Sequence, residues 1–382
     1  YDRAIVEGVR RTEEHPYDAE GFTRLAEIYD AAGRDSLARS TFDEAFKIDT
    51  TNTNTLYAIA DYYFREGNIT RMLDYEQYLF RSDKVDIESK LERLEEYTSN
   101  RNFYGANYHR IGGIIQKMAI DHPNNRALKY IYSQHLIAGG SHNEALEYLR
   151  RHLEDEDAEA DDYIYVIELE RYMGHEEAVM ADMMVALERF PESLSLLTHY
   201  AYLLSEEGDY ERAIWLFKSA LDYAKSDDER SSIVGSIADM YHQMGDKKRA
   251  FRNYKKALAL NGDNDLVLNN YAYNLSLMDR DLDKALKMAT RAVELQPTNA
   301  TYIDTKAWVL HRLGRNEEAK VVMRQALSFS SLQDAPLLMH YGDILWSLGE
   351  KFMAETYWQK AVERGYDKEL MEAHIQIIKR KN

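Results

Sequence analysis

The sequence of 382 residues predicts an all-α fold, a solenoid of helix–turn–helix repeats, and three regularities support this prediction. Glycines return at a fixed interval, prolines keep a second register, and alanines stand at constant distances from the glycines. The interval is 34 residues for Gly33 to Gly67, Gly140 to Gly174 and Gly174 to Gly208, and 35 for Gly314 to Gly349. Repeats of this length are typical of helix pairs that bury their apolar faces only against neighbouring pairs.

The glycines are expected at the turn inside each pair, because glycine adopts backbone conformations that other residues avoid. The longer glycine intervals are multiples of the period plus a few residues: Gly67 to Gly140 is two periods plus five, and Gly245 to Gly314 is two periods plus one. Such insertions are expected in turns.

The prolines are expected at the ends of the pairs. Pro16, Pro123, Pro191 and Pro297 each follow a helical pattern. A proline there ends the second helix, because it has no amide hydrogen and disfavours helical geometry in the preceding residue. Pro336 is expected in the first turn of a helix instead.

Small residues at fixed distances from the turn glycine predict where the helices pack most closely. Alanine or glycine stands seven residues before most turn glycines, and alanine stands five and twelve residues after them. In the first repeat these are Ala26, Ala38 and Ala45, with the larger Tyr29 and Phe42 between them. Alternating small and large side chains allow facing helices to interlock.

This set of positions resembles the tetratricopeptide repeat (TPR) family, and the resemblance covers nearly the whole chain. It is carried in the first repeat by Leu25, Ala26, Tyr29, Gly33, Ala38, Phe42 and Ala45, and segments 194–227 and 231–264 match almost as fully. The resemblance implies a right-handed superhelix. The stretches 268–273, 300–308 and 340–343 are also similar to a subgroup of bacterial TPR proteins, many of them exported or lipid-anchored.

Taken in order, the repeats predict one quasi-linear solenoid over residues 1–367, with about nine to ten repeats, rather than separate globular domains. Residues 1–16 form a half repeat, and 85–125 is divergent. Residues 368–382 are expected to be a C-terminal capping helix and tail, since Leu370, His374, Ile377 and Ile378 form an apolar stripe. The expected repeats are 17–50, 53–84, 85–125, 126–159, 160–193, 194–227, 231–264, 265–299, 300–334 and 335–367.

The divergent segment contains Gly112 and Gly113 in the middle of an expected helix. Each glycine there costs about 1 kcal/mol relative to alanine. Close approach of a neighbouring helix is the expected cause, and a bend in the solenoid or a ligand seat is the alternative. The role of the whole irregular region 68–122 stays open at this point.

Composition limits the classes of partner. The net charge of −18 and the pI near 5.2 argue against nucleic acid, which is bound through basic patches. The sequence has no cysteine, so disulfides and thiol chemistry are excluded, and it has no apolar run long enough to span a membrane. Tyr1 is not an initiator methionine, so any membrane association is expected only through a missing N-terminal anchor. The resemblance favours a periplasmic or lipid-anchored location at the bacterial envelope over the cytoplasm.

No catalytic motif emerges, and we expect no enzyme activity, metal or cofactor. Phosphate-binding loops, dinucleotide motifs and nucleophile elbows are absent from the sequence. His175 and Glu176 begin like a zinc-protease motif, but Val179 stands where the second histidine belongs. The acidic run 154–162 has Ala160 and Val166 where a calcium loop needs glycine and glutamate, so a solvated loop between repeats is predicted.

The binding surface is located by the resemblance, which implies that the first helix of each pair lines a concave groove. Its fifth and ninth residues lie one turn apart on the same stripe. Aromatic and acidic residues alternate there, a mixture suited to peptide binding, although aromatics could instead pack against the next helix. The predicted partner contacts are Tyr57, Asp61, Tyr130, Glu168, Tyr202, Asp239, Tyr273, Asp304, Trp308, Asp343 and Trp346.

These features predict a non-enzymatic scaffold that binds a basic or neutral peptide or protein segment, as a monomer or weak homodimer. The alternative is an accessory or regulatory arm of an envelope glycan- or lipid-assembly enzyme complex. Lysine at Asp239 and Asp343 is expected to abolish binding of a basic partner without lowering the melting temperature.

Overall fold

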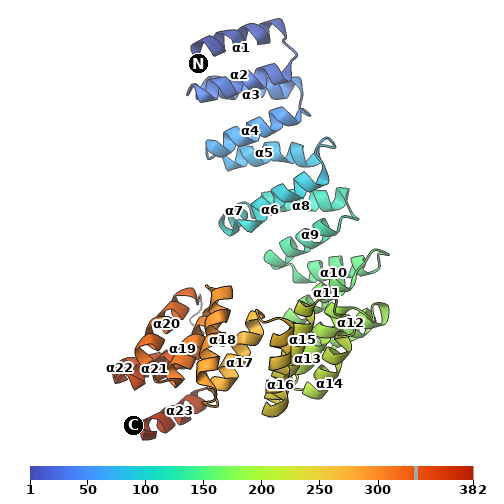
Figure 1. Cartoon of the computed structure of the whole chain (residues 1–382). Coiled ribbons are helices and arrows are strands. Elements are labelled where there is room, and N and C mark those ends of the chain that lie inside the picture. Colours follow the sequence, from blue (N-terminus) through green and yellow to red (C-terminus); the bar gives the residue numbers. More distant parts are fainter. Residues whose placement is uncertain (331–333, 382) are drawn as a thin grey trace. The chain divides into compact units, whose positions relative to one another are not determined.

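The computed structural model describes residues 1–330 and 334–381, and that part of the chain contains 23 α-helices and no strand (Figure 1). The predicted all-α class is confirmed. The chain divides into two compact units, Tyr1–Glu176 and Glu177–Asn382. The single solenoid over residues 1–367 stays a prediction.

Unit 1 consists of helices that stack in chain order (Figure 1). Each first helix of a pair packs on its own second helix, and α2 also contacts α4, the first helix of the next pair. The helices are α1 (Asp2–Glu14), α2 (Ala19–Ala31), α3 (Asp35–Ile48), α4 (Thr53–Arg65), α5 (Ile69–Arg81), α6 (Ile87–Ser99), α7 (Arg101–Ala106), α8 (Tyr108–Asp121), α9 (Arg126–Ala138), α10 (His142–Leu153) and α11 (Ala160–Tyr172).

Unit 2 repeats the same arrangement, with α15 contacting α17, α17 contacting α19 and α19 contacting α21. Its helices are α12 (Glu176–Arg189), α13 (Leu194–Glu206), α14 (Tyr210–Ala220), α15 (Asp227–Gln243), α16 (Lys247–Leu260), α17 (Asp265–Ser276), α18 (Leu282–Leu295), α19 (Ala300–Arg312), α20 (Asn316–Phe329), α21 (Ala335–Ser347), α22 (Lys351–Glu363) and α23 (Lys368–Lys381).

The turn glycines have the left-handed backbone that their spacing predicts. Their φ angles lie between 70° and 82° at Gly33, Gly67, Gly140, Gly174, Gly208, Gly245, Gly314 and Gly349. The interval of two periods plus one contains a turn without glycine: Asp279 lies 34 residues after Gly245 and has φ of 49°. A residue with a Cβ is strained there, and the Arg312 guanidinium donates a 2.8 Å hydrogen bond to its carboxylate. Glycine spacing could not reveal this turn.

The small residues lie where the helices meet, as predicted. Ala26, Ala38 and Ala45 are completely buried, and Phe42 fills the space between the helices. A larger side chain at these alanines would have no space in an interior packed this closely. The alternation of small and large residues is therefore the packing rule of the repeats.

The divergent segment contains an extra pair of elements. Helices α6 and α7 are inserted between α5 and α8, which contact each other directly. At Gly112 an added Cβ would lie 2.3 Å from the His135 imidazole of α9, so the expected close approach of a neighbouring helix is found. At Gly113 an added Cβ would meet nothing within 4 Å, and this glycine borders a cavity of about 330 Å³.

Helix α23 covers the end of unit 2, and part of the predicted stripe, His374 and Ile378, faces that unit. Met371 is buried, and Ile375 and Ile378 pack against the core of α19–α22. Leu370 and Ile377 are exposed instead. The His374 Nε2 lies 2.8 Å from Oδ1 of Asp343 of α21.

Candidate functional site

Four of the predicted partner contacts lie in the core of unit 2 rather than on a solvent-facing groove. Asp304, Trp308, Asp343 and Trp346 are only 3% to 8% exposed. Helix α21 contacts Asp304 and Trp308 of α19, whereas α22 and α23 contact Asp343 of α21 and α22 also contacts Trp346. These side chains are held by internal contacts, which differ from the solvent-facing arrangement expected from the sequence.

Asp304 and Trp308 of α19 enclose a histidine of α21. The His340 Nδ1 lies 2.9 and 3.0 Å from the two carboxylate oxygens of Asp304. The His340 ring stacks on Trp308 with 4.2 Å between ring centroids. Burial on its own lowers the pKa of His340, but the charge and hydrogen bond of Asp304 and the charge of Asp343 together raise it. The pair therefore joins two repeats through a buried imidazole–carboxylate contact.

Asp343 of α21 accepts hydrogen bonds from two later helices. The Trp358 Nε1 of α22 donates at 2.9 Å, and the His374 Nε2 of α23 lies 2.8 and 2.9 Å from the two carboxylate oxygens. Trp346 packs against Trp358, with 5.5 Å between ring centroids. Because Asp343 joins three helices, a substitution there changes folding as well as any surface. We therefore expect lysine at this position to lower the melting temperature, contrary to the prediction from the sequence.

Asp239 of α15 is half-buried and has a similar role. Its carboxylate accepts hydrogen bonds from the Tyr254 hydroxyl and, at 3.1 Å, from the Asn270 amide of α17. Burial raises the pKa of Asp239, and these two hydrogen bonds oppose that rise. The Tyr202 hydroxyl of α13 similarly lies 2.7 Å from the Ser236 hydroxyl of α15.

We call four of these pairs the inter-repeat polar contacts. Each joins the first helix of one repeat to the first helix of the next repeat or, in the last pair, to the capping helix α23. Tyr273 of α17 lies beside them, half-buried, with its ring 6.1 Å from that of His340. Burial raises its pKa. The inter-repeat polar contacts are Tyr202–Ser236, Asp239–Asn270, Asp304–His340 and Asp343–His374.

The His340–Asp304 pair should make the stability of unit 2 depend on pH. A histidine whose folded pKa is raised contributes its full stability below the unfolded value of about 6.5, and this contribution is lost as pH rises through the folded pKa. The measurement is thermal unfolding from about pH 5.5 to 9, for the original chain and for His340→Gln. The difference in melting temperature should shrink as pH rises. A difference that stays constant would contradict the charged pair.

The remaining predicted residues lie in unit 1 and are more accessible. The Arg93 guanidinium lies 5.2 Å from the ring centroid of Tyr57 of α4, and Asp61 is exposed on the same helix. Glu168 of α11 forms an ion pair with Arg171 at 3.1 Å. Tyr130 of α9 is 41% exposed. Tyr130 borders a cavity of about 450 Å³.

This cavity, which we call the tyrosine cleft, has a volume of about 450 Å³ and lies between α9, α10 and α11. Tyr130 and Tyr165 line it next to each other, with their rings in contact at 4.8 Å between centroids, and Tyr165 is 40% exposed. Leu149 and Ala158 add apolar surface. The repeat spacing from Tyr130 leads to Ile164, so sequence register missed Tyr165 by one residue.

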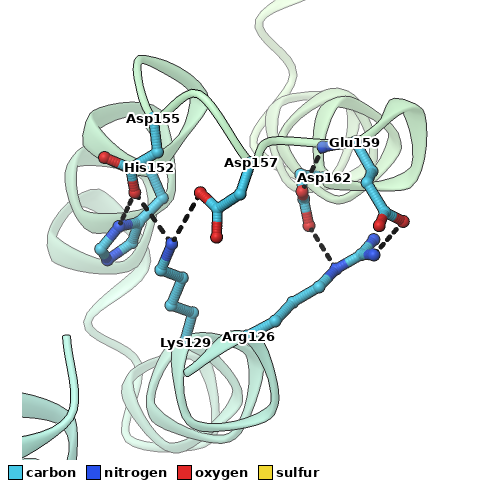
Figure 2. A network of polar contacts seen from close by, with 7 residues as sticks. All are labelled: Arg126, Lys129, His152, Asp155, Asp157, Glu159 and Asp162. Atoms are coloured by element: carbon cyan, nitrogen blue, oxygen red, sulfur yellow. Dashed lines mark hydrogen bonds and ion pairs between the residues drawn. The ribbon is translucent and has the colours of Figure 1, made fainter. Parts of the chain in front are cut away.

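Figure 2 shows the polar network that shapes the tyrosine cleft. The buried Lys129 ammonium lies 2.8 Å from Asp155 and 3.8 Å from Asp157. The His152 Nδ1 lies 3.0 Å from the same Asp155 carboxylate. The Lys129 ammonium and the His152 contact hold the pKa of Asp155 below its usual value. A lysine head group in the interior is stable only with such partners.

Arg126 completes the network on the other side of the cleft (Figure 2). Its guanidinium pairs with Glu159, and its Nε lies 3.3 Å from Asp162. The Asp162 carboxylate accepts a 2.8 Å hydrogen bond from the Glu159 amide, in a capping box that begins α11. Much of the acidic run 154–162 therefore binds cations of α9 and does not simply face solvent.

The chemistry of the tyrosine cleft suits a cationic or neutral side chain. Two exposed phenol rings offer apolar faces and cation–π contacts. Three carboxylates line the cleft, those of Asp157, Asp161 and Asp162, against two cations, Arg126 and Lys129. Both cations already have carboxylate partners, so the cleft holds an excess of negative charge.

The fold and these sites define a helical-hairpin repeat protein. Two tetratricopeptide repeat models match the chain, over residues 138–287 and 300–331. The chain therefore contains tetratricopeptide repeats over these residues. TPR proteins bind protein partners and are typically non-enzymatic, so the chain is a protein-interaction scaffold.

Three similar proteins show how far the likeness extends. Photosystem I assembly protein Ycf3 of Synechococcus sp. (strain CC9605) is 28% identical over 149 residues, which cover 34% of this chain and 84% of that protein. Cellulose synthase operon protein C of Pseudomonas fluorescens (strain SBW25) is 27% identical over 132 residues, 35% of this chain but 10% of that protein. The crystal structure of a TPR protein from Parabacteroides merdae ATCC 43184 shares the fold, with a TM-score of 0.50, 18% identity, and coverage of 65% of this chain and 97% of that one.

Proposed function

We propose that the chain is a non-enzymatic scaffold that binds a basic or neutral protein segment at the tyrosine cleft of unit 1. The observation that carries this proposal is the exposed pair Tyr130 and Tyr165 at a cavity that three carboxylates and two already paired cations also line. Tyrosines of this kind supply much contact area at small entropic cost, and they are frequent in binding hot spots.

The ion pairs of the cleft support the proposal because they fix its walls before a partner arrives. Lys129 and Arg126 join α9 to the loop 154–159 and to α11. A surface that is already ordered loses less conformational entropy on binding. A guest side chain would therefore meet preformed ring faces and carboxylates.

Replacing Tyr130 and Tyr165 together with alanine should weaken binding of a short lysine-rich peptide that contains one leucine by about tenfold or more. The loss follows from removal of both ring faces. Fluorescence anisotropy with the labelled peptide measures it, and circular dichroism verifies the fold. Tyr17→Ala is the matched control, because Tyr17 is exposed outside the cleft and should leave affinity unchanged. Equal affinity for the double variant and the original chain would remove the proposal.

The second candidate is an accessory arm of an envelope glycan-assembly complex. The partial likeness to the protein named cellulose synthase operon protein C favours it, although the match spans one tenth of that protein. An assembly role would also agree with the name of the Ycf3 relatives. The envelope location stays part of this proposal, and no helix among the described residues has the length and apolar content needed to cross a membrane. Fractionation of the native organism, followed by mass spectrometry of cross-linked partners, separates the two candidates.

A further inference from the structure

Helix α16 of unit 2 has the opposite charge from most of the chain. Its 14 residues, Lys247–Leu260, include six basic side chains and no acidic one. The whole chain carries a net charge of −18. The six are Lys247, Lys248, Arg249, Arg252, Lys255 and Lys256.

A cavity of about 550 Å³ lies along this helix, between α16, the C-terminal half of α17 and the turn that follows it. We call it the basic cleft. Its base is apolar, with Tyr271 and Leu275 buried and Phe251 half-buried. Five cationic side chains border it, against a single carboxylate, that of Asp281.

Most of these cations have no internal partner. Arg280 lies 3.6 Å from Asp281. By contrast, Arg291 of α18 pairs with Asp263 at 2.8 Å. Four cations of the basic cleft form no ion pair with any residue in 1–330 or 334–378, the part whose side chains are described: Lys247, Lys248, Arg252 and Lys255.

The unpaired cations are arranged to act together. Lys248, Arg252 and Lys255 follow one another at intervals of four and three residues, so they lie on one face of α16. Like charges this close repel each other, and this repulsion is relieved when an anionic group binds between them. Beneath them, the Tyr271 ring is fixed by stacking on Tyr254, with 5.2 Å between ring centroids.

We propose that the basic cleft binds an acidic segment of a partner protein, with an apolar side chain of that segment on the base of the cleft. Charge complementarity selects the carboxylates, and the apolar base selects a mixed segment over a uniform polyanion. Nucleic acid fits less well, because its long backbone would also meet the net negative charge of the chain. This surface lies in unit 2 and does not rest on the function proposed for the tyrosine cleft.

The test uses the full chain and a fluorescein-labelled peptide of aspartate and glutamate with one central leucine. The double variant Arg252→Glu with Lys255→Glu should weaken binding by about tenfold or more. The matched control is Lys218→Glu with Arg324→Glu, two exposed cations of unit 2 outside the cleft, which changes the net charge by the same amount and should alter affinity less than about twofold. Serine in place of the peptide leucine should also weaken binding.

Several outcomes would overturn the proposal. Equal binding of the peptide in which asparagine and glutamine replace the acids would exclude charge selection. Equal losses in both double variants would indicate a general effect of charge. Tight binding of a single-stranded oligonucleotide, without binding of the acidic peptide, would assign the cleft to nucleic acid. Self-association that the Arg252 and Lys255 variant abolishes, measured by light scattering without peptide, would assign it to a second copy.

The two proposed surfaces can fail independently. The Tyr130 and Tyr165 double variant should bind the acidic peptide as the original chain does. The Arg252 and Lys255 double variant should likewise keep its affinity for the lysine-rich peptide. A variant that lost both peptides while its circular dichroism stayed unchanged would contradict the separation of the two sites.

Discussion

Replacing Asp343 with lysine should lower the free energy of unfolding of unit 2 by about 3–5 kcal/mol. The carboxylate is almost completely buried and accepts hydrogen bonds from Trp358 and His374. Lysine would place an ammonium group in the same interior and leave both donors without an acceptor. Urea unfolding followed by circular dichroism measures the change.

Two further variants separate burial from charge. Asp61→Lys makes the same charge reversal at an exposed position and should change stability by less than about 0.5 kcal/mol. Asp343→Asn keeps an acceptor for Trp358, so its loss of stability should lie between those of Asp61→Lys and Asp343→Lys. If the free energy of unfolding of Asp343→Lys lay within about 1 kcal/mol of that of the original chain, the interior role of Asp343 would be disproved.

Replacing Arg93 with alanine should destabilise unit 1 by about 3–5 kcal/mol. Its partner Glu76 is completely buried, and the Arg93 Nε donates a 2.6 Å hydrogen bond to that carboxylate. Burial on its own lowers the pKa of Arg93, but the hydrogen bond and charge of Glu76 raise it above its usual value. Without the guanidinium, a buried carboxylate would have lost its cation.

A double variant tests whether this loss comes from the stranded charge. Glu76→Met together with Arg93→Met replaces the pair by apolar side chains of similar volume, and such replacements are often neutral or stabilising. The double variant should recover most of the stability that Arg93→Ala loses, in the same urea experiment. A double variant as unstable as Arg93→Ala would show that packing of Arg93 on Tyr57 and Tyr97 is the larger contribution.

The fold could be predicted from the sequence because the packing of helix pairs has strict geometric requirements. Turns need a residue with a left-handed backbone conformation, and closely packed helices need alanine. Positions such as Gly33 and Ala38 therefore make the repeat visible in the sequence. The turn at Asp279 was not predicted, because here an aspartate whose carboxylate is bound by Arg312 has the left-handed backbone that glycine has in the other turns. The insertion of α6 and α7 was not predicted, because the sequence of these two helices does not follow the repeat period.

The candidate sites were less predictable because a helical stripe shows direction but not what covers it. Asp304 and Asp343 lie on the predicted stripe, yet a histidine of α21 covers the first and a histidine of α23 covers the second. A signal was available: His340 follows Asp304 by 36 residues and His374 follows Asp343 by 31, each close to one repeat. The basic cleft was also missed, because a total charge of −18 hides six cations on one helix.

The inter-repeat polar contacts make the order of the repeats in unit 2 part of the encoded information. Each pair matches a donor in one element to an acceptor in its neighbour, and three chemistries occur among the four joints: hydroxyl with hydroxyl, amide with carboxylate, and, at two of them, imidazole with carboxylate. Exchanging or duplicating a repeat would place unmatched polar groups at two joints. Engineers who shorten, lengthen or shuffle this array must therefore move the residues of each joint together with the helices on both sides of it.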